Sequence, residues 1–257
     1  MTATETGQRR TPPLAIFTDF DGTLVELAET PDAIAVPQSL PAQLERAFRE
    51  FDCAFALLTG REISDIDRYL APLQLPVAGA HGTQRRRADG SVEPLDAGVI
   101  AGASAIAEAI VPLVEAHPLL LVETKPGAVA LHYRQVPELE DAARIAMEEA
   151  VHEAAGFTLV PGKMVFEARP SATSKGEALR AFMREEPFAG RVPIAIGDDT
   201  TDEDAFIAAQ ELGGTGIKLG AGDTAARLRI ADIASVHKLL RGLADIMASE
   251  RGAVTTH

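Results

Sequence analysis

The sequence predicts an α/β protein with a Rossmann-like parallel sheet and an inserted α+β domain. Short apolar segments alternate with segments of helical periodicity over residues 14–98, and again over residues 171–257. This alternation is typical of βαβ units, in which helices cover both faces of a parallel sheet. Over residues 99–170 each helix is instead followed by a pair of strands. We therefore predict a core domain (14–98 and 171–257), an inserted domain (99–170) and a disordered lead (1–13).

The first half of the core contains three predicted strands. The apolar run 14–17 predicts a buried strand, and residues 39–51 then place leucine, alanine and phenylalanine at helical spacing. Residues 54–58 predict the second strand, and isoleucine and leucine recur at helical spacing over 63–70. The third strand is expected at 76–80, and a hairpin that turns at Asp89-Gly90 is expected over 84–95. Strands and helices in this order indicate consecutive βαβ units.

The inserted domain (99–170) is predicted to contain a helix, a hairpin, a second helix and a second hairpin. Each hairpin is joined through a Pro-Gly pair, at Pro126-Gly127 and Pro161-Gly162. The predicted segments are helix 99–116, strands 119–124 and 129–133, helix 137–154, and strands 157–160 and 164–167.

The second half of the core returns to alternating helices and strands. Ser174 is expected to cap the first of these helices. The predicted segments are helix 175–184, strand 192–196, helix 203–211, strand 216–219 and helix 235–249.

Composition excludes some classes of function. The formal net charge of -14 argues against nucleic acid or an anionic membrane surface as the main partner. The single Cys53 lies in the apolar run 51–58, so we expect it to be buried, and one cysteine cannot form an internal disulfide. Arg9-Arg10 is not followed by the apolar segment of an export signal, and we expect no apolar run of membrane-spanning length. These features predict a cytoplasmic protein. The sequence does not determine the oligomeric state, and we expect a monomer or a weak dimer.

Two aspartates follow the first predicted strand. Asp19 and Asp21 lie just before Gly22 and Thr23. Like charges this close disfavour ionisation of both carboxyl groups, and a divalent cation between them would remove the conflict. The all-oxygen ligand set favours Mg²⁺. One carboxylate could then attack phosphorus while the other transfers protons. The alternative is an ordinary strand end with an Asp-Gly turn.

Three further loops carry groups suited to phosphoryl transfer. Thr59, Gly60 and Arg61 offer a hydroxyl and backbone N–H groups near a helix start, where phosphate oxygens bind. Lys175 supplies a positive charge, and the acidic run 197–202 can complete a metal site. Each loop alone is also explained by a turn, a solvated lysine or acidic capping of a helix. In an open parallel sheet, however, all four loops would meet at the carboxyl ends of the strands, where ligands bind.

These loops together resemble those of the haloacid dehalogenase (HAD) superfamily of phosphotransferases, in the subclass with an α/β (C2-type) cap. The resemblance implies that Asp19 is the nucleophile that forms an aspartyl-phosphate. It also implies that Asp21 is the general acid and base. Thr59 and Lys175 match the groups that bind the phosphate during catalysis.

The same resemblance implies a Mg²⁺ cofactor. Asp19, Asp21 and Asp198 match the metal ligands, with Asp21 acting through its backbone carbonyl. Asp199 and Asp202 belong to the same acidic loop as Asp198. They are expected to contact the metal ligands rather than the ion.

Four longer segments narrow the resemblance to the trehalose-6-phosphate phosphatases. They are 78–82 (AGAHG), 123–134, 162–167 (GKMVFE) and 197–206 (GDDTTDEDAF). The similarity covers about 14–220, so it includes both the core and the insert. Thr59 stands where many members of the family carry serine, and it keeps the hydroxyl group.

The resemblance also implies which residues bind the substrate. Glu123 and Lys125 alternate on one face of a predicted strand, and Glu167 ends the last strand of the insert. In the family such cap residues recognise glucose. For His132 and Arg134, charges that face solvent are an equally good explanation. The remaining residues expected at the substrate are Gly60, Arg61, His81 and Gly82.

The predicted function is Mg²⁺-dependent hydrolysis of trehalose 6-phosphate to trehalose and phosphate through an aspartyl-phosphate. Three alternatives stay open: a phosphatase for another sugar phosphate such as sucrose 6-phosphate, a phosphomutase of the same fold, and a catalytically silent domain that binds a sugar phosphate. The core motifs would be the same in the two phosphatases, so only the insert distinguishes them. The expected partner is a small molecule, with neither nucleic acid nor a membrane involved.

Overall fold

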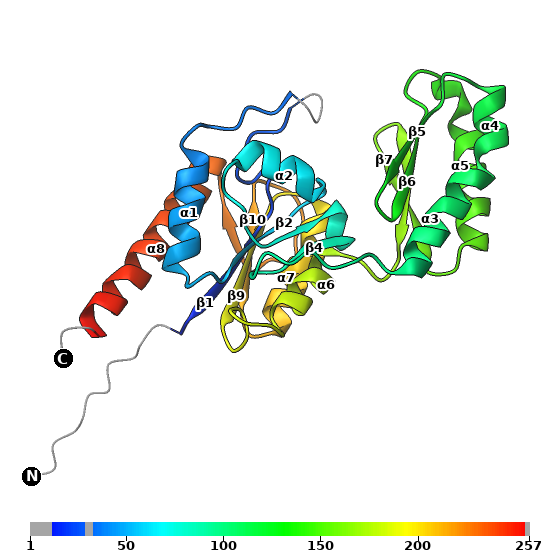
Figure 1. The fold of residues 1–257 in the computed structure, drawn as a ribbon. Helices are drawn as coiled ribbons and strands as arrows, with labels where there is room; N and C mark the ends of the chain where they lie inside the picture. Colours follow the sequence, from blue (N-terminus) through cyan, green and yellow to red (C-terminus); the bar gives the residue numbers. More distant parts are fainter. Residues whose placement is uncertain (1–11, 29–32, 255–257) are drawn as a thin grey trace, which may run out of the picture.

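A computed structural model of the chain describes residues 12–28 and 33–254, with side chains as far as residue 250. Nearly all of the lead predicted at residues 1–13 lies outside the described residues. Figure 1 shows two lobes, a larger one built on the core sheet and a smaller one built on a second sheet. The chain passes from the core to the smaller lobe after β4, and it returns between β8 and α6.

One sheet of seven strands forms the core. Its order is β11-β10-β9-β1-β2-β3-β4, and neighbouring strands are parallel except β4, which runs antiparallel to β3. The predicted α/β fold with a parallel sheet is therefore confirmed. The short strand β11 was not predicted. The strands are β1 (Leu14–Thr18), β2 (Phe55–Leu58), β3 (Val77–Gly79), β4 (Gln84–Arg86), β9 (Val192–Gly197), β10 (Thr215–Leu219) and β11 (Leu228–Ile230).

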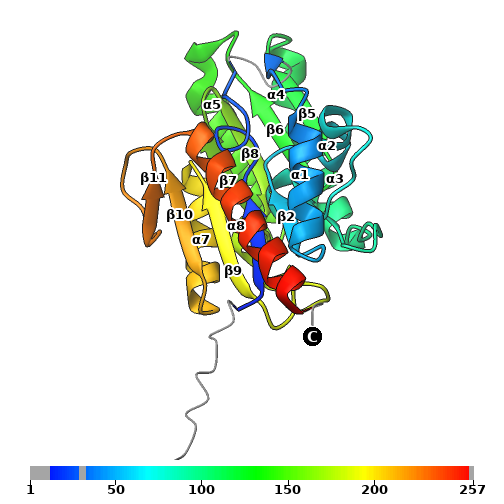
Figure 2. The same cartoon turned by 90° about the vertical axis from the view of Figure 1, so that its left-hand side faces the viewer.

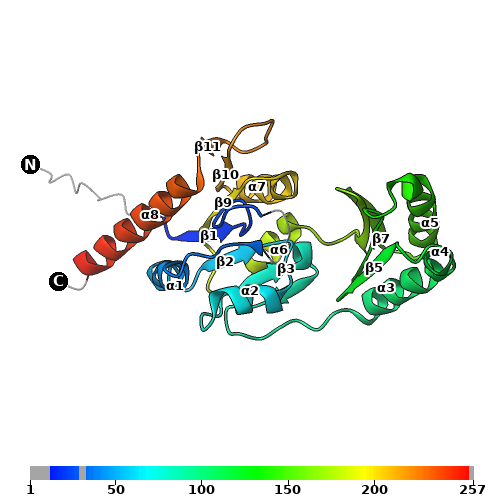
Figure 3. The ribbon, with the colours of Figure 1, turned by 90° about the horizontal axis from the view of Figure 1, so that it is seen from above.

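Helices cover both faces of this sheet. Side chains of α1, α2 and α8 pack on one face, and those of α6 and α7 pack on the other. Figure 2 shows α1 and α8 side by side across the first face, and Figure 3 shows the core from above. The helices are α1 (Leu40–Glu50), α2 (Ile63–Leu70), α6 (Lys175–Phe182), α7 (Glu203–Glu211) and α8 (Ile233–Val254).

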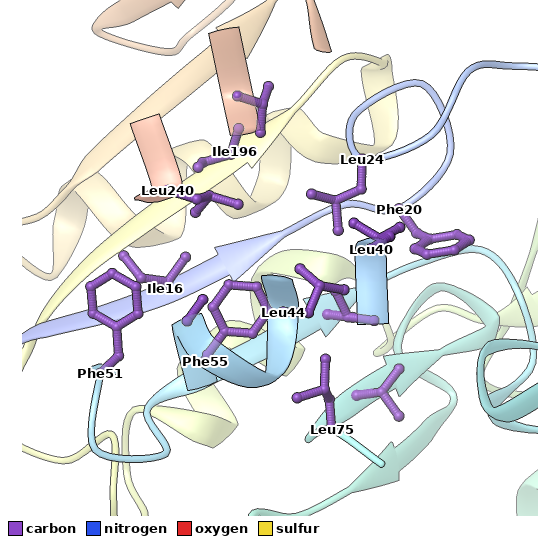
Figure 4. Packing of buried hydrophobic residues seen from close by; sticks show 14 of the residues in the cluster. Ile16, Phe20, Leu24, Leu40, Leu44, Phe51, Phe55, Leu75, Ile196 and Leu240 are labelled. Carbon is purple, nitrogen blue, oxygen red and sulfur yellow. The ribbon is translucent and has the colours of Figure 1, made fainter. Parts of the chain in front are cut away.

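Alternation along the central strand β1 fills both hydrophobic layers. Ile16 packs with Leu44 of α1 and Leu240 of α8 on the first face (Figure 4). Phe17 points to the other face, where its ring centroid lies 6.0 Å from that of Phe182. Burying one such side chain stabilises the fold by roughly 1.5–3 kcal/mol. These two layers hold the ends of the central strands rigidly in place.

The smaller lobe is an antiparallel sheet covered by helices on one face. Its strand order is β5-β6-β8-β7. Ile106, Leu131, Met147 and Phe166 belong to its hydrophobic core, which lies between this sheet and the helices. Its elements are α3 (Ala97–Ala109), α4 (Val111–Ala116), β5 (Leu121–Lys125), β6 (Ala128–His132), α5 (Glu140–Glu153), β7 (Phe157–Gly162) and β8 (Val165–Pro170).

Cys53 is exposed, so the prediction that it is buried was wrong. The apolar run around it is interrupted by a turn between α1 and β2. Asp52 and Cys53 both have positive φ angles there, of 50° and 66°. The turn directs the Cys53 side chain outward, while Ala54 and Phe55 behind it are buried.

The expectation that no apolar run reaches membrane-spanning length was also wrong. The helical segment Ala97–Ala116 has 20 residues and a mean hydropathy of 1.9, and only 17% of it is buried. Length and composition alone would let it cross a membrane, which is a weak indication for a single helix. In the fold the segment is divided at Ile110, before Pro112. Its buried residues Ala103, Ile106 and Ile110 belong to the hydrophobic core of the smaller lobe.

Candidate active site

The site lies where the strand order of the core sheet reverses. From β1 the chain continues to β2 and β3 on one side, and it later adds β9 and β10 on the other. Loops at the carboxyl ends of β1 and β9 therefore diverge and leave a crevice between them. A cavity of about 510 Å³ opens there and extends to the smaller lobe. The predicted site residues that line it are Asp19, Asp21, Gly60, Arg61, His81, Glu123, Lys125, His132, Lys175, Asp198 and Asp199.

Lys175 connects two of the predicted aspartates. Its Nζ donates hydrogen bonds to Asp19 Oδ1 and Asp202 Oδ1, each at 2.7 Å. The side chains of Lys175, Asp19 and Asp202 are only 3%, 6% and 2% exposed. Ser174 caps α6 by accepting a hydrogen bond from the Glu177 N–H, and the cap places Lys175 at the first helical position. The helix start thus fixes the ammonium group beneath the cavity.

Burial governs the protonation of this cluster. It raises the pKa of Asp19 well above its usual value, and Lys175 only partly opposes this. Burial also raises the pKa of Asp202, to about 6. For Lys175 burial alone would lower the pKa, but the charges of Asp19 and Asp202 outweigh it and raise the pKa. Two buried carboxyl groups thus share one ammonium, and a cation bound beside them would favour the ionised form of both.

The acidic residues fit a divalent cation. Carboxylate oxygens of Asp19, Asp198 and Asp202 lie within 4.8 Å of one another. Both carboxylate oxygens of Asp202 already accept hydrogen bonds. Its Oδ1 accepts one from Lys175, and its Oδ2 accepts the backbone N–H groups of Asp198 and Asp199 at 3.0 and 3.1 Å. Within the described residues, Asp19 Oδ2 and Asp198 Oδ2 accept no hydrogen bond. Two oxygens of Asp19 and Asp198 could therefore ligate a hard cation such as Mg²⁺, with Asp202 beside them.

Three residues that were not among the predicted site residues hold Asp198 in place. Thr23 Oγ1 donates to Asp198 Oδ1 at 3.0 Å, and the buried Lys218 donates to its backbone carbonyl. Gly22 has a φ of +76°, and a Cβ there would lie 2.3 Å from Asp198 Oδ2. Lys218 could have been noticed as the one charged residue in the predicted strand 216–219. Its contact with the acidic loop could not, because that contact depends on strand pairing.

Asp21 is paired with Arg61 in this structure. Arg61 Nε donates to Asp21 Oδ2 and its Nη2 donates to Asp21 Oδ1, both at 2.7 Å. The guanidinium carbon also lies 5.1 Å from the ring centroid of Tyr69. Thr59 is fully buried behind them, and its hydroxyl accepts the Arg61 N–H at 3.1 Å. Both carboxylate oxygens of Asp21 therefore accept hydrogen bonds from Arg61 in this structure.

The smaller lobe contributes a charged cluster to the cavity. Glu123 Oε2 lies 2.8 Å from His132 Nε2, and Glu123 Oε1 lies 3.6 Å from Lys125 Nζ. Lys125 also approaches Glu167 Oε1 at 4.0 Å. Glu123 and Glu167 both pair with Ala130 across the strands, so they share one face of the sheet. The alanine between them is small and buried, and Lys125 lies between the two carboxylates.

His81 closes the core side of the cavity. Burial, reinforced by the charges of Lys175 and Arg169, lowers its pKa to about 4, so the imidazole is neutral at pH 7. A Cβ on Gly60 would lie 2.7 Å from the His81 ring, and one on Gly82 would lie 2.8 Å from the Ser174 carbonyl. Both glycines therefore permit close packing of the loops.

Some predicted residues do not line the cavity. Thr59 and Asp202 lie buried behind it, and Glu167 meets it through Lys125. Arg134 is exposed just beyond β6. The roles assigned to all of the predicted site residues, including those that line the cavity, stay predictions. Residues that line the cavity but were not predicted are Leu27, Ala28, Ile34, Glu62, Asp65 and Thr201.

Known proteins resemble the chain over most of its length. The family model of trehalose-phosphatases matches residues 17–233. A probable trehalose-phosphate phosphatase of Sinorhizobium fredii is 43% identical over 80% of this chain and 77% of its own length. The trehalose-6-phosphate phosphatase of Escherichia coli is 37% identical over 92% of this chain and 89% of its own length.

Solved structures agree with this assignment. The crystal structure of a trehalose-6-phosphate phosphatase related protein has a TM-score of 0.73 at 28% identity, covering 92% of this chain and 99% of that one. A HAD superfamily phosphatase from Bacteroides thetaiotaomicron shares the fold, with a TM-score of 0.60 at 17% identity and coverage of 95% and 99%. The predicted HAD fold is thereby confirmed. The chain is a member of the trehalose-phosphatase family.

Proposed function

We propose that the protein hydrolyses trehalose 6-phosphate to trehalose and phosphate in a Mg²⁺-dependent reaction. The observation that carries this proposal is the position of two different clusters on one cavity. The core provides Asp19, Lys175 and Asp198, which are suited to phosphoryl transfer, and the smaller lobe provides Glu123 and Lys125. Sugar hydroxyl groups need directed donors and acceptors of this kind. The named activities of the relatives support the same substrate.

The proposed reaction has two steps, both at phosphorus. The Asp19 carboxylate attacks the phosphorus opposite the sugar oxygen, forming an aspartyl-phosphate as the bond from phosphorus to the sugar oxygen breaks. Asp21 donates a proton to the departing oxygen, and trehalose leaves. Asp21 then takes a proton from a water molecule that attacks the aspartyl-phosphate, which releases phosphate and restores Asp19.

The surrounding groups bind and orient the phosphoryl group. Lys175 and the Thr59 hydroxyl would stabilise its oxygens, while Lys175 also holds the Asp19 carboxylate. Asp19, Asp198 and the Asp21 backbone carbonyl would hold a Mg²⁺ ion, whose charge offsets that of the transferring group when it is bound. Arg61 must leave Asp21 before proton transfer, and an incoming phosphate is a suitable competing anion for it.

Phosphate release from a panel of substrates tests the proposal. The panel contains trehalose 6-phosphate and the 6-phosphates of sucrose, glucose and mannose, each with Mg²⁺ and with EDTA. We expect a strong preference for trehalose 6-phosphate that EDTA abolishes. Equal rates on all four would contradict the proposed substrate. Binding without release from any of them would contradict the proposed reaction.

A further inference from the structure

Arg169 differs from the other cations that are not fully exposed. In the part of the chain that the structure describes, it forms neither a hydrogen bond nor an ion pair, and its Nε is buried without a partner. Every other buried or half-buried lysine or arginine there has an acceptor. These are Arg61, Arg85, Arg86, Lys125, Arg144, Lys175, Arg180, Arg191 and Lys218.

Strand alternation places Arg169 on the cavity side of the smaller lobe. In β8, Phe166, Ala168 and Pro170 are buried against the helices, whereas Glu167 and Arg169 are only half-buried. Arg169 is therefore on the same face as Glu167, which approaches Lys125 at 4.0 Å. It is also the nearest of these charged residues, along the chain, to the core.

Two observations relate Arg169 to the core side of the cavity, where Lys175 lies. Four residues separate Arg169 from Ser174, which caps the helix that begins with Lys175. The Arg169 charge also acts on the core residue His81, together with those of Lys175 and Lys125. Lys175 and Lys125 are each balanced by two carboxylates, but Arg169 is not balanced.

A half-buried guanidinium without an anion is costly, so a ligand should supply the missing acceptor. The chain has 38 acidic residues against 24 basic ones, and none of those described pairs with Arg169. A neutral sugar hydroxyl would leave its charge unbalanced, whereas a phosphoryl group would balance it and accept hydrogen bonds from a planar guanidinium.

We propose that Arg169 binds the phosphoryl group from the base of the smaller lobe, both in the substrate and in the product phosphate. The identity of this anion rests on the proposed function. Arg169 would then link the two lobes through the ligand, because the other phosphate-binding groups belong to the core. It is a binding residue for the anion and not for the sugar.

Inorganic phosphate is the probe, because it distinguishes binding of the anion from binding of the sugar. We would titrate phosphate and, separately, trehalose into the Mg²⁺-loaded protein by calorimetry, for the wild type, Arg169→Gln and Arg169→Lys. Arg184→Gln is the matched control, because it removes the same charge from an exposed arginine just after α6. Melting temperatures show whether each variant is folded.

We expect Arg169→Gln to weaken phosphate binding by about tenfold or more, which corresponds to at least about 1.4 kcal/mol. Arg169→Lys should recover part of this loss, since it keeps the charge but not the planar fork. Trehalose binding and the Arg184→Gln control should stay within about twofold of the wild type. Activity on trehalose 6-phosphate and on p-nitrophenyl phosphate should fall alike, because both carry the phosphoryl group.

Unchanged phosphate binding in Arg169→Gln would overturn the proposal, as would a loss confined to trehalose. If Arg169→Gln does not fold, phosphate binding by Arg169→Lys that equals the wild type would overturn it as well. A wild-type protein that does not hydrolyse trehalose 6-phosphate would contradict the proposed function, while the phosphate titration would still decide the role of Arg169.

Discussion

The two sheets of the molecule handle charge in different ways. In the core, Lys175, Asp19 and Asp202 are almost completely removed from solvent and are held by short hydrogen bonds. In the smaller lobe, the Glu123 side chain is 49% exposed and that of Lys125 is 22% exposed, and their ion pair is longer. The core cluster is therefore organised before any ligand arrives. The cluster in the smaller lobe remains accessible to a ligand that can replace its contacts.

This difference follows from how each sheet is covered. Helices cover both faces of the core sheet, and the core residues of the candidate site lie in the loops and helix starts at the ends of its strands. Helices cover one face of the smaller sheet, so its strands alternate between apolar residues and a polar face that points to the cavity. We infer a division of labour in which the core performs the chemistry, while Glu123 and Lys125 of the smaller lobe select the sugar.

Loss of the nucleophile should have the largest effect. Asp19→Asn should lower kcat by at least about 10³-fold on both trehalose 6-phosphate and p-nitrophenyl phosphate, because an amide cannot form the aspartyl-phosphate. The melting temperature should stay close to that of the wild type, since the amide oxygen can still accept the Lys175 hydrogen bond. Wild-type turnover in this variant would rule out the proposed nucleophile.

Metal removal should have the next largest effect. EDTA should abolish turnover of both substrates, because the carboxylates of Asp19 and Asp198 then lack a cation between them. Adding Mg²⁺ to the metal-free protein should raise its melting temperature, since an ion that binds only the folded state stabilises it. Turnover that is insensitive to EDTA, or a melting temperature that does not respond to Mg²⁺, would contradict the proposed dependence on Mg²⁺.

A change in the smaller lobe should affect one substrate only. Glu123→Ala should lower kcat/KM for trehalose 6-phosphate by about 10- to 100-fold, and for p-nitrophenyl phosphate by less than about threefold. The neighbouring Thr124→Ala is the matched control, because Thr124 is exposed on the opposite face of β5. Equal losses on both substrates would argue against a contact between Glu123 and the sugar.

The smallest predicted effect concerns stability and pH. Burial lowers the pKa of His81 from 6.5 to about 4, so between these values the unfolded chain binds a proton that the folded chain does not. The resulting stability is complete above pH 6.5 and is lost as the pH falls towards 4. Between pH 7 and pH 5 this loss amounts to about 2 kcal/mol.

Urea unfolding at these two pH values measures this contribution. His81→Asn should show a correspondingly smaller loss of stability than the wild type between pH 7 and pH 5. Asparagine suits the test because it tolerates the left-handed backbone at this position, where φ is 54°. If the wild type and His81→Asn lose equal stability, His81 does not remain neutral in the folded state.

Most elements of the fold could be predicted from periodicity. The helix expected at 203–211 is α7 with the same bounds, and the strand expected at 192–196 is β9 with one more residue. The strand β11 was missed because its three residues are largely exposed at the edge of the sheet and carry little apolar pattern. Cys53 was misplaced because two residues with positive φ interrupt its apolar run.

The site was predictable where its residues follow strand ends, and less so where tertiary contacts define it. The aspartates Asp19 and Asp198 follow strands, and they were found by this position. The contact between Lys218 and the Asp198 carbonyl depends on the pairing of β10 with β9. Arg169 is distinguished only because its buried Nε has no hydrogen-bond acceptor among the described residues, and a sequence cannot show this.

The ratio of kcat/KM for trehalose 6-phosphate to that for p-nitrophenyl phosphate tests the division of labour most directly. We would measure it in the wild type, in the core variant Thr59→Ala and in the smaller-lobe variant Lys125→Met. We expect Thr59→Ala to slow both substrates and to keep the ratio within about twofold, whereas Lys125→Met should lower the ratio by about tenfold or more. A ratio that falls in the core variant, or that stays constant in Lys125→Met, would contradict the division of labour.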